Sequence, residues 1–450
     1  MSDFESVARF AGLRRLDLRG GDPRAHSQWR ALCDRSTGLD GEADAAARAI
    51  VEQVRREGDV VVAMLTERFE ARALTPDQFE VPLARAREAL ERLEPGLRRA
   101  LEQAAANVRR FHARQMVALQ TTGETTGEPG DETCLLSRVA PLDRVAVYAP
   151  GGTAAYPSSV LHAAIPAKVA GVREVILLTP RPSEVVLAAA AIAGVDRIFQ
   201  IGGAQAIAAV AFGTKTLPRV DKIVGPGNAW VTAAKRLVFG RCDIDSIAGP
   251  SEILVVADRS ADPELIAADL ISQAEHDVLA SPVLVCSDAE LPARVDAALL
   301  GQLADLPRRE IAEAALRDHG AAVIVADRDA LAREADAFAP EHLELLVERP
   351  RELAEQIHHA GAIFVGAWTP EAAGDYTAGP SHVLPTAGGA RFSSPLGCWE
   401  FVRYTSVLHL SATQLREQAD AITRLARAEG LEGHARAVEQ RLRTNEGDPT

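Results

Sequence analysis

Apolar residues recur along this chain with two different spacings, which predict alternating helices and strands. In residues 43–72 and 77–118 they return every three to four positions, and this spacing predicts amphipathic helices. Short apolar runs that end in Gly or Pro predict buried strands; they occupy residues 144–152, 174–180, 197–203 and 221–228. Three of the four runs precede an Ala-rich helical stretch, which is typical of a parallel sheet with crossover helices.

A second series of apolar runs predicts a second sheet. These runs occupy residues 252–258, 281–288, 321–327, 343–348 and 362–367, and helical segments separate them. We therefore expect an α/β fold with two tandem Rossmann-like, parallel-sheet domains.

The segments outside the two series are expected to be an arm, a loop and a helical tail. Residues 1–40 are rich in Arg and Gly with weak periodicity, and they are predicted to form an arm. The Gly/Thr/Glu-rich stretch 121–133 predicts a loop or the tip of a hairpin. Two helices are expected near 413–428 and 431–443.

Composition and charge narrow the class of protein. The 450 residues are 47% hydrophobic and 25% charged, as in ordinary globular proteins. A net charge of -14 disfavours binding to nucleic acid. The longest apolar run, 185–195, is too short to span a bilayer, and no signal peptide is expected. Five scattered cysteines without CxxC spacing indicate reduced thiols, so we expect a cytoplasmic protein without disulfides or a thiolate metal site.

The stretch SQAEHD, residues 272–277, could hold a metal ion. Asp262 is a good N-cap for the preceding helix, and Gln273 and His276 are then expected on one face. Two neutral donors placed in this way could bind one ion. The alternative is a polar helix end with a surface histidine, since histidine is favoured near a helix C-terminus.

The stretch APEHLEL, residues 339–345, precedes a buried strand and could carry general acid/base chemistry. Pro340 disfavours helix before it, so Glu341 and His342 are expected at a turn. A neighbouring carboxylate and imidazole suit proton transfer near neutral pH. A solvated pair of loop residues is the alternative.

Two irregular stretches near the C-terminus contain further candidates. Asp375, in residues 373–386, could be a metal ligand or could form an Asx-turn. Glu429 and His434, in residues 428–434, could point into a cleft or could flank a simple helix–helix junction with a glycine cap.

Two glycine-containing loops, GGAQA (202–206) and GPGNA (225–229), each follow a predicted strand and open a helix. Backbone N–H groups at such a position favour an anion such as pyrophosphate. Neither loop is a GxGxxG motif, so tight turns required for packing remain an equal alternative.

Taken together, these segments resemble the histidinol dehydrogenase family over nearly the whole chain after residue 40. The segments that carry the resemblance are 148–172, 202–214, 220–236, 248–258, 269–277, 340–345, 373–386 and 429–439, in that order. Eight segments in the correct order are far more specific than any one of them.

The resemblance implies a role for each candidate residue. It implies one zinc ion per subunit, held by Gln273, His276, Asp375 and His434. It implies Glu341 and His342 as the acid/base residues, and NAD contacts from Tyr148, Gln205 and Asn228. The substrate contacts that it implies are Ser251, Glu429 and His342 together with the zinc ligands.

The implied reaction is a four-electron oxidation of L-histidinol to L-histidine through L-histidinaldehyde with two NAD+, the last step of histidine biosynthesis. The resemblance also implies a homodimer in which the C-terminal domains are exchanged, so that His434 and Glu429 act in the partner subunit's site. The domains expected on this basis are 41–140 with 251–390 for metal and catalysis, 141–250 for NAD, and 391–450 for dimerisation.

Three residues depart from the family pattern. Ser381, Val278 and Ser246 stand where Asn, Pro and Met are expected. None is a ligand or base position, although Ser381 could change a loop hydrogen bond near the site. These departures leave open a related zinc- and NAD-dependent dehydrogenase acting on another polar amino or sulfo alcohol.

Overall fold

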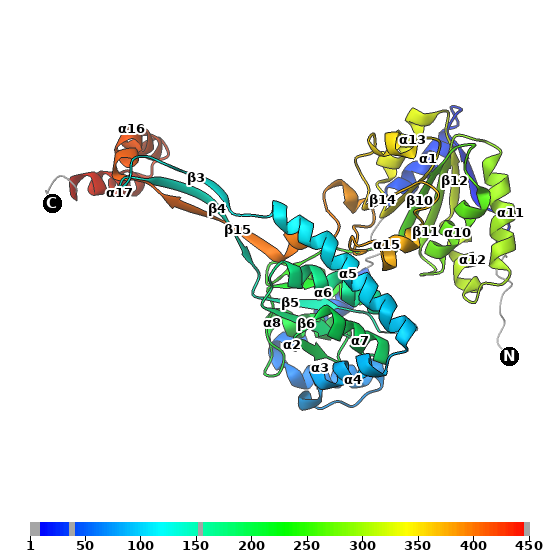
Figure 1. The fold of residues 1–450 in the computed structure, drawn as a ribbon, viewed down its shortest axis with the longest axis horizontal. Helices are drawn as coiled ribbons and strands as arrows, with labels where there is room; N and C mark the ends of the chain where they lie inside the picture. Colours follow the sequence, from blue (N-terminus) through cyan, green and yellow to red (C-terminus); the bar gives the residue numbers. More distant parts are fainter. Residues whose placement is uncertain (1–9, 36–40, 152–155, 445–450) are drawn as a thin grey trace. The chain divides into compact units, whose positions relative to one another are not determined.

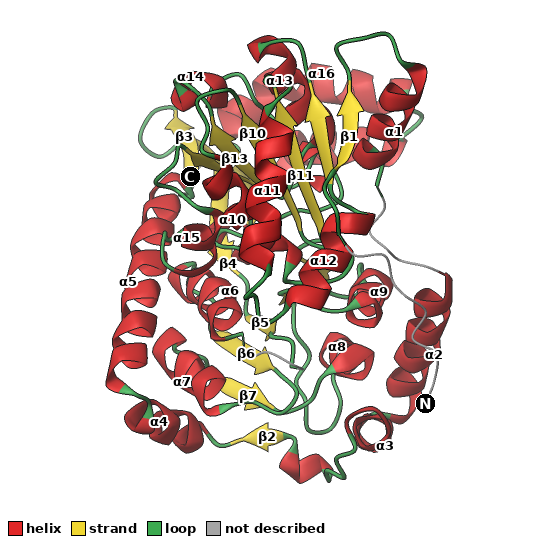
Figure 2. Ribbon diagram, turned by 90° about the vertical axis from the view of Figure 1, so that its right-hand side faces the viewer, coloured by secondary structure: helices red, strands yellow, loops and turns green. Residues whose placement is uncertain are grey.

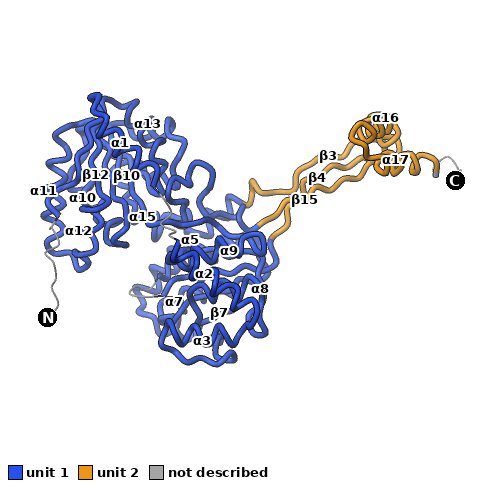
Figure 3. The backbone as a smooth tube through the Cα atoms, turned by 180° about the vertical axis from the view of Figure 1, so that it is seen from behind, with its two compact units in different colours: residues 1–115, 142–401 blue, residues 116–141, 402–450 orange. Residues whose placement is uncertain are grey.

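The computed structural model describes residues 10–35, 41–151 and 156–444. Contacts along the chain divide it into two compact units, residues 1–115 with 142–401 and residues 116–141 with 402–450 (Figure 3). Within the described residues, the first unit contains two six-stranded sheets and the second contains a three-stranded sheet. None of the helices in this part of the chain is long and apolar enough to cross a membrane.

The first sheet has the order β1-β12-β11-β10-β13-β14, and every neighbouring pair is parallel (Figure 1). Its strands are β1 (Arg14–Asp17), β10 (Glu252–Ala257), β11 (Ser281–Cys286), β12 (Ala321–Ile324), β13 (His342–Leu346) and β14 (Ala362–Val365). All six residues of β10 are buried, as expected for a parallel sheet that is covered on both faces.

Helices cover both faces of this first sheet (Figure 2). One face packs against residues of α1 (Pro23–Cys33), α13 (Arg328–Phe338) and α14 (Pro350–Ala354). The other face packs against α10 (Pro263–Ala274), α11 (Leu291–Leu303) and α12 (Arg309–Asp318). The short helices α15 (Glu371–Tyr376) and η2 (Gly389–Arg391) lie in the connections that follow β14.

The second sheet has the order β2-β7-β6-β5-β8-β9, in which only the edge pair β2–β7 is antiparallel. Its strands are β2 (Glu80–Val81), β5 (Arg144–Tyr148), β6 (Glu174–Leu178), β7 (Arg197–Phe199), β8 (Lys222–Val224) and β9 (Asp243–Ile244). One face carries α2 (Gly41–Glu57), α3 (Asp59–Glu70), α8 (Gly203–Phe212) and α9 (Ala229–Val238) (Figure 2). The elements outside that layer are η1 (Pro76–Gln78), α4 (Leu83–Arg92), α5 (Pro95–Ala118), α6 (Pro157–Val169), α7 (Glu184–Ala193) and η3 (Cys398–Phe401).

The order of strands reverses once in each sheet. In the second sheet the chain runs from β5 outward to β7 and then returns to the other side of β5 for β8. In the first sheet it runs from β10 to β12 and returns to the other side of β10 for β13. The expected α/β fold with two parallel sheets is confirmed, and each sheet has a switch point of the kind at which α/β proteins bind ligands.

The second unit is a long antiparallel sheet with two helices. Strands β3 (Thr122–Thr126) and β4 (Thr133–Pro141) form a hairpin, and β15 (Val402–His409) pairs with β4 over eight residues. The predicted C-terminal helices are α16 (Ala412–Ala428) and α17 (Glu432–Thr444), which pack on each other.

The boundaries of the domains differ from those expected. Residues 1–40 were expected as an arm, but the described part of this segment, residues 10–35, contains β1, which is the edge strand of the first sheet. Only Leu16 in the RRLD sequence of β1 is buried, so no apolar run marks this strand. Residues 41–115 were expected with the first sheet, but α2 packs on α8 and α9, and α4 packs on α7. The C-terminal unit begins at Val402 instead of 391 and also takes residues 116–141.

Candidate active site

His342 is the first residue of β13, and its imidazole is buried. Its Nδ1 lies 2.9 Å from the carbonyl oxygen of Glu252, which is the first residue of the neighbouring strand β10. A carbonyl only accepts hydrogen bonds, so Nδ1 carries the proton and a neutral ring presents its lone pair at Nε2. Nε2 has no hydrogen-bond partner among the described residues, which leaves it free to accept a proton.

Glu341 is buried immediately before β13. Its Oε2 accepts a hydrogen bond of 2.9 Å from the backbone N–H of Glu252 and lies 3.7 Å from Nδ1 of His342. Burial raises the pKa of Glu341 to about 8, while His342 acts to lower it. A carboxyl group that titrates near neutral pH suits general base chemistry.

Three side chains with ligand atoms converge near Nε2 of His342. One ligand atom from each of His276, Glu371 and Asp375 lies within 4.8 Å of the other two. Nε2 of His342 is 3.7 Å from Oε1 of Glu371 and 3.9 Å from Oδ1 of Asp375. This set of nitrogen and oxygen atoms fits a divalent ion such as zinc.

The C-terminal end of α10 carries a second group that suits a ligand. Gln273 is fully buried, and neither polar atom of its amide has a partner among the described residues. An unpaired buried amide costs about 1–3 kcal/mol, so a bound group that satisfies it is expected. His276 follows one turn later, and although the residue is exposed, nearby atoms displace water from its ring and lower the pKa of His276.

Behind these ligand atoms lies a group of buried acids. The hydroxyl of Ser272 donates to Oε2 of Glu371 at 2.9 Å, and the carboxyl groups of Asp269 and Glu344 hydrogen-bond each other. Burial, followed by the charge of Asp375, raises the pKa of Glu371 to about 8. Burial, followed by the charge of Asp269, raises the pKa of Glu344 to about 10.

Two stacked histidines connect Asp375 to helix α6 of the second sheet. The rings of His162 and His382 lie 4.4 Å apart with an interplanar angle of 20°. Nδ1 of His382 lies 3.0 Å from the carbonyl oxygen of Asp375, and the hydroxyl of Ser381 donates to the carbonyl of His162 at 3.0 Å. Burial lowers the pKa of His162 to about 3 and that of His382 to about 4, so both rings are neutral. Ser381, one of the departures from the family pattern, therefore makes a hydrogen bond between the two halves of this unit.

The second sheet gathers a different set at the carboxyl ends of its strands. Tyr148 ends β5, and its hydroxyl accepts a hydrogen bond of 3.1 Å from the N–H of Gly203, at the start of α8. Gln205 is buried in the first turn of α8, and its Oε1 has no partner among the described residues. Asn228 caps α9 by accepting a hydrogen bond of 3.1 Å from Val231. Two helix N-termini at a switch point form a favourable environment for an anionic cofactor.

Comparison with known proteins decides the family. The model of a family described as histidinol dehydrogenase matches residues 34–442. The chain is 49% identical to the histidinol dehydrogenase of Cupriavidus pinatubonensis over 436 residues, 96% of this chain and 97% of that protein. It is 45% identical to that of Aquifex aeolicus over 430 residues, 95% of this chain and 99% of that protein. The crystal structure of histidinol dehydrogenase from Elizabethkingia anophelis matches with a TM-score of 0.88 and 30% identity, covering 98% of this chain and 100% of that one.

The chain belongs to the histidinol dehydrogenase family. It is therefore an enzyme of the NAD-dependent oxidoreductase class.

Most residues that the histidinol dehydrogenase resemblance assigns to metal, substrate and catalysis lie close together in the first unit. They are Gln273, His276, Glu341, His342 and Asp375, with Ser251 directly before Glu252. Glu429 and His434 lie in the second unit, where Glu429 caps α16 and both side chains are exposed. The roles assigned to all these residues stay predictions.

Glu252 and Glu371 contribute to the site and were not among the residues expected in a histidinol dehydrogenase. Glu252 is a carboxylate at the start of an otherwise apolar strand, and this unusual position was the available signal. Glu371 lies four residues before Asp375, a spacing that places both side chains on one helix face.

Proposed function

We propose that the chain oxidises L-histidinol to L-histidine through L-histidinaldehyde, with two molecules of NAD+. The name shared by relatives 45–49% identical over nearly the whole chain supports this substrate. The observation that carries the proposal is the unpartnered Nε2 of His342, which lies beside the cluster of His276, Glu371 and Asp375. The alcohol and then the hydrated aldehyde each lose two electrons and two hydrogens, giving one NADH and one proton in each step.

Zinc is the proposed metal, with Gln273, His276 and Asp375 as ligands and the fourth place taken by His434 of the partner subunit. The unpartnered amide of Gln273 and the short distances between His276 and Asp375 support the fit. When bound, zinc has no redox chemistry and would hold and orient the substrate as a Lewis acid.

His342 is the proposed base for the alcohol. Its Nδ1 proton is held by the carbonyl of Glu252, so Nε2 is the nitrogen that accepts the hydroxyl proton. The ring then becomes a cation, and the carboxyl oxygens of Glu371 and Asp375, which lie 3.7 and 3.9 Å from Nε2, stabilise it.

Glu341 is the proposed base for water in the second half of the reaction. Its carboxylate accepts one backbone hydrogen bond from Glu252, and it is buried beside the ring of His342. A proton taken from water by this carboxylate gives the hydroxide equivalent that adds to the aldehyde carbon. His342 then assists the second oxidation.

Ser251 and Glu429 are the remaining proposed contacts to the substrate. Ser251 precedes β10 and thus lies at the edge where Glu341 and His342 are found. The carboxylate of Glu429 suits the cationic amino group of L-histidinol. Like His434, Glu429 belongs to the second unit, and we propose that the partner subunit of a homodimer supplies both residues.

NAD is proposed to bind at the carboxyl edge of the second sheet, with contacts from Tyr148, Gln205 and Asn228. The unpartnered Oε1 of Gln205 and the N-termini of α8 and α9 support this placement. NAD supplies the hydride acceptor in both oxidations.

The test is NADH formation from L-histidinol, measured with dialysed protein and again after zinc is restored. We expect two NADH per L-histidinol, L-histidine as the product, and activity that depends on the metal. A yield of one NADH with released aldehyde, or turnover only on another amino or sulfo alcohol in a panel, would contradict the proposal.

The dimer is tested with His434→Asn and His342→Asn. Each variant alone should be inactive, but mixed dimers of the two should regain about a quarter to a half of the activity, because one of the two sites is then intact. Mixed dimers that stay inactive would show that His434 acts within its own chain, and an active His434→Asn variant would show that His434 has no part in the site.

A further inference from the structure

Glu252 contacts both proposed bases through its main chain. Its N–H donates to Oε2 of Glu341 at 2.9 Å, and its carbonyl oxygen lies 2.9 Å from Nδ1 of His342. The first contact places the Glu341 carboxylate, and the second sets which nitrogen of His342 is free. A small movement of this one residue would therefore misplace both groups.

The side chain of Glu252 is itself held by three donors. The backbone N–H of Ala387 donates to Oε1 at 2.7 Å, and the backbone N–H of Glu341 donates to Oε2 at 3.3 Å. The third donor is Arg35, whose Nε lies 2.6 Å from Oε1 and whose Nη2 pairs with Oε2. Glu252 is 2% exposed, so this two-point contact supplies a full positive charge to a carboxylate that has little access to water.

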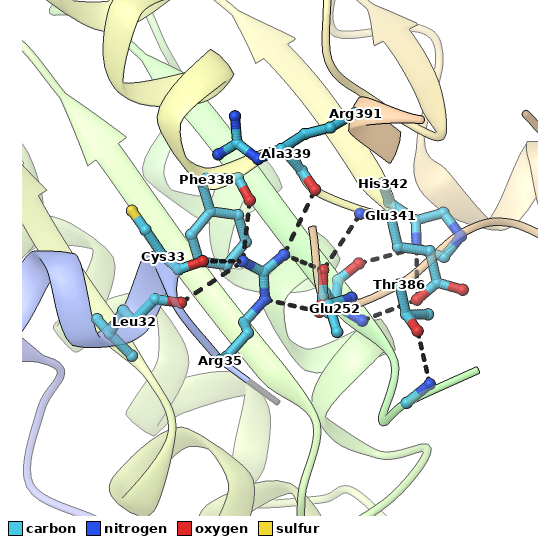
Figure 4. Close-up of polar contacts among 12 residues, drawn as sticks. Leu32, Cys33, Arg35, Glu252, Phe338, Ala339, Glu341, His342, Thr386 and Arg391 are labelled. Atoms are coloured by element: carbon cyan, nitrogen blue, oxygen red, sulfur yellow. Dashed lines mark hydrogen bonds and ion pairs between the residues drawn. The ribbon is translucent and has the colours of Figure 1, made fainter. Parts of the chain in front are cut away.

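Arg35 is fixed on its other side by main-chain carbonyls and a ring. Its Nη1 donates to the carbonyl of Phe338 at 2.9 Å, and its guanidinium carbon lies 3.7 Å from the centre of the Phe338 ring. Nη2 also contacts the carbonyl of Ala339 at 3.4 Å. Figure 4 shows the guanidinium between these carbonyls and the Glu252 carboxylate, with Glu341 and His342 beyond it.

The contact with Ala339 involves a strained turn. Ala339 has a φ of 50°, a left-handed conformation that is unfavourable for a residue with a side chain, and it lies two residues before Glu341. Arg35 therefore binds the start of the short connection that leads to Glu341 and His342, and it reaches Glu341 only through Glu252. A lysine could replace the charge, but it lacks the planar fork with which Arg35 contacts both oxygens of Glu252 as well as the carbonyls of Phe338 and Ala339.

From this geometry we infer that Arg35, which follows helix α1, is a positioning residue for the oxidation and acts on Glu341 and His342 through Glu252. The inference rests on the proposed function of those two residues. Arg35 has no contact with the ligand group of His276, Glu371 and Asp375 among the interactions of the described residues, so its effect should be on turnover and not on metal binding.

The test uses the zinc-loaded protein and the variants Arg35→Lys, Arg35→Gln, Glu252→Gln and the double variant Arg35→Gln/Glu252→Gln. We expect Arg35→Lys to lower kcat by about 10–100-fold, the cost of a misplacement near 1 Å. The KM for L-histidinol and the zinc content should stay close to those of the unchanged protein. Because the two residues act as one unit, the double variant should lose no more than the worse single variant.

The matched control is Arg144→Lys. Arg144 and Glu174 likewise form an Arg–Glu ion pair, with Nε 2.6 Å from Oε2, and both begin strands of the second sheet at the edge away from Tyr148. We expect this control to lower the melting temperature about as much as Arg35→Lys while leaving kcat within about twofold.

Chemical rescue separates positioning from simple stabilisation. In Arg35→Ala, guanidinium ion at millimolar concentration should restore part of kcat without raising the melting temperature. An unchanged kcat in Arg35→Lys, an equal loss of kcat in Arg144→Lys, or a parallel loss of zinc would overturn the inference. If the unchanged protein does not oxidise L-histidinol, the proposed function has failed instead.

Discussion

The candidate functional groups of the two parallel sheets in the first unit lie at opposite edges. In the second sheet, Tyr148 and Asn228 lie at or after the carboxyl ends of β5 and β8, beside the N-termini of helices. In the first sheet, Glu252 and His342 are the first residues of β10 and β13, so the candidate catalytic group lies at the amino ends. The C-terminus of α10, with Gln273, reaches that same edge.

The difference follows from the direction of the helices. In a parallel sheet the connecting helices run opposite to the strands, so helix N-termini gather at one edge and helix C-termini at the other. The partial positive charge of an N-terminus suits an anionic cofactor, and the partial negative charge of a C-terminus suits a metal cation and a basic substrate. One architecture used twice in a chain can therefore offer two sites of opposite electrostatic preference.

The largest effect is expected at the amino edge. His342→Asn removes the free Nε2 and should lower turnover by about 10²–10⁴-fold, the usual contribution of a general base, while zinc content is unchanged. His319→Asn, in the cap of α12 outside the site, is the control and should keep normal turnover. A loss of zinc in His342→Asn would assign this residue to the metal instead of the base.

Two buried amides, Gln273 at the amino edge of the first sheet and Gln205 at the carboxyl edge of the second, test whether the two edges bind their ligands independently. Gln273→Leu should weaken zinc binding by at least the roughly 10–100-fold that loss of an outer-shell partner costs, with the affinity for NAD unchanged. Gln205→Leu should weaken NAD binding and leave the affinity for zinc unchanged, because the unpartnered Oε1 of Gln205 lies at the carboxyl edge of the second sheet. Competition with a chelator measures the affinity for zinc, and titration with NAD measures the affinity for NAD. If each variant weakens the binding of both zinc and NAD, the two edges form one coupled site.

A smaller effect is expected from Gly225→Ala at the carboxyl edge. Gly225 has a φ of 111°, and an added Cβ would come within 2.2 Å of the carbonyl oxygen of Tyr148. The strand ends must then separate, so the KM for NAD should rise several-fold while zinc content is unchanged. The control, Gly240→Ala, has a similar φ of 91° but an added Cβ there meets no atom within 4 Å. An equal rise of the KM for NAD in Gly225→Ala and Gly240→Ala would reflect backbone strain alone.

The smallest effect concerns the stability of the folded protein, to which the buried acids behind the amino edge contribute. The pKa of Glu344 is raised to about 10 in the folded protein from a usual value near 4.5. The folded state therefore keeps a proton that the unfolded chain releases, so this contribution to stability is complete below pH 4.5 and is lost as pH rises toward 10. Melting temperatures of the protein in EDTA should fall between pH 5 and pH 9, and those of Glu344→Gln should fall less, by a few degrees. If melting temperature falls with pH equally in the unchanged protein and in Glu344→Gln, the raised pKa of Glu344 is contradicted.

Much of the fold could be predicted from local patterns. All nine strands expected in the two apolar series are present, because a strand in the interior of a parallel sheet is covered on both faces and is therefore mostly apolar. Gln273 and His276 were expected one turn apart, and Glu341 and His342 were expected next to a strand. These statements depend only on residues a few positions apart.

Short edge elements could not be predicted in that way. The strand β1, with a single buried residue, and the two-residue strands β2 and β9 have no periodicity to detect. They form because a neighbouring strand offers unpaired backbone groups, and for β1 and β2 that neighbour lies far away in sequence.

What the sequence by itself determined is the set of helices and core strands and the residue types available for chemistry, since spacing and burial preference act locally. Only the tertiary structure decided that α2, α3 and α4 pack with the helices of the second sheet, that Glu371 joins His276 and Asp375, and that Arg35 reaches Glu252 across 217 positions of chain. Such choices depend on which surfaces fit together with the largest apolar burial and the fewest unpaired polar groups. That free energy belongs to the whole packed unit and is not encoded in any single segment.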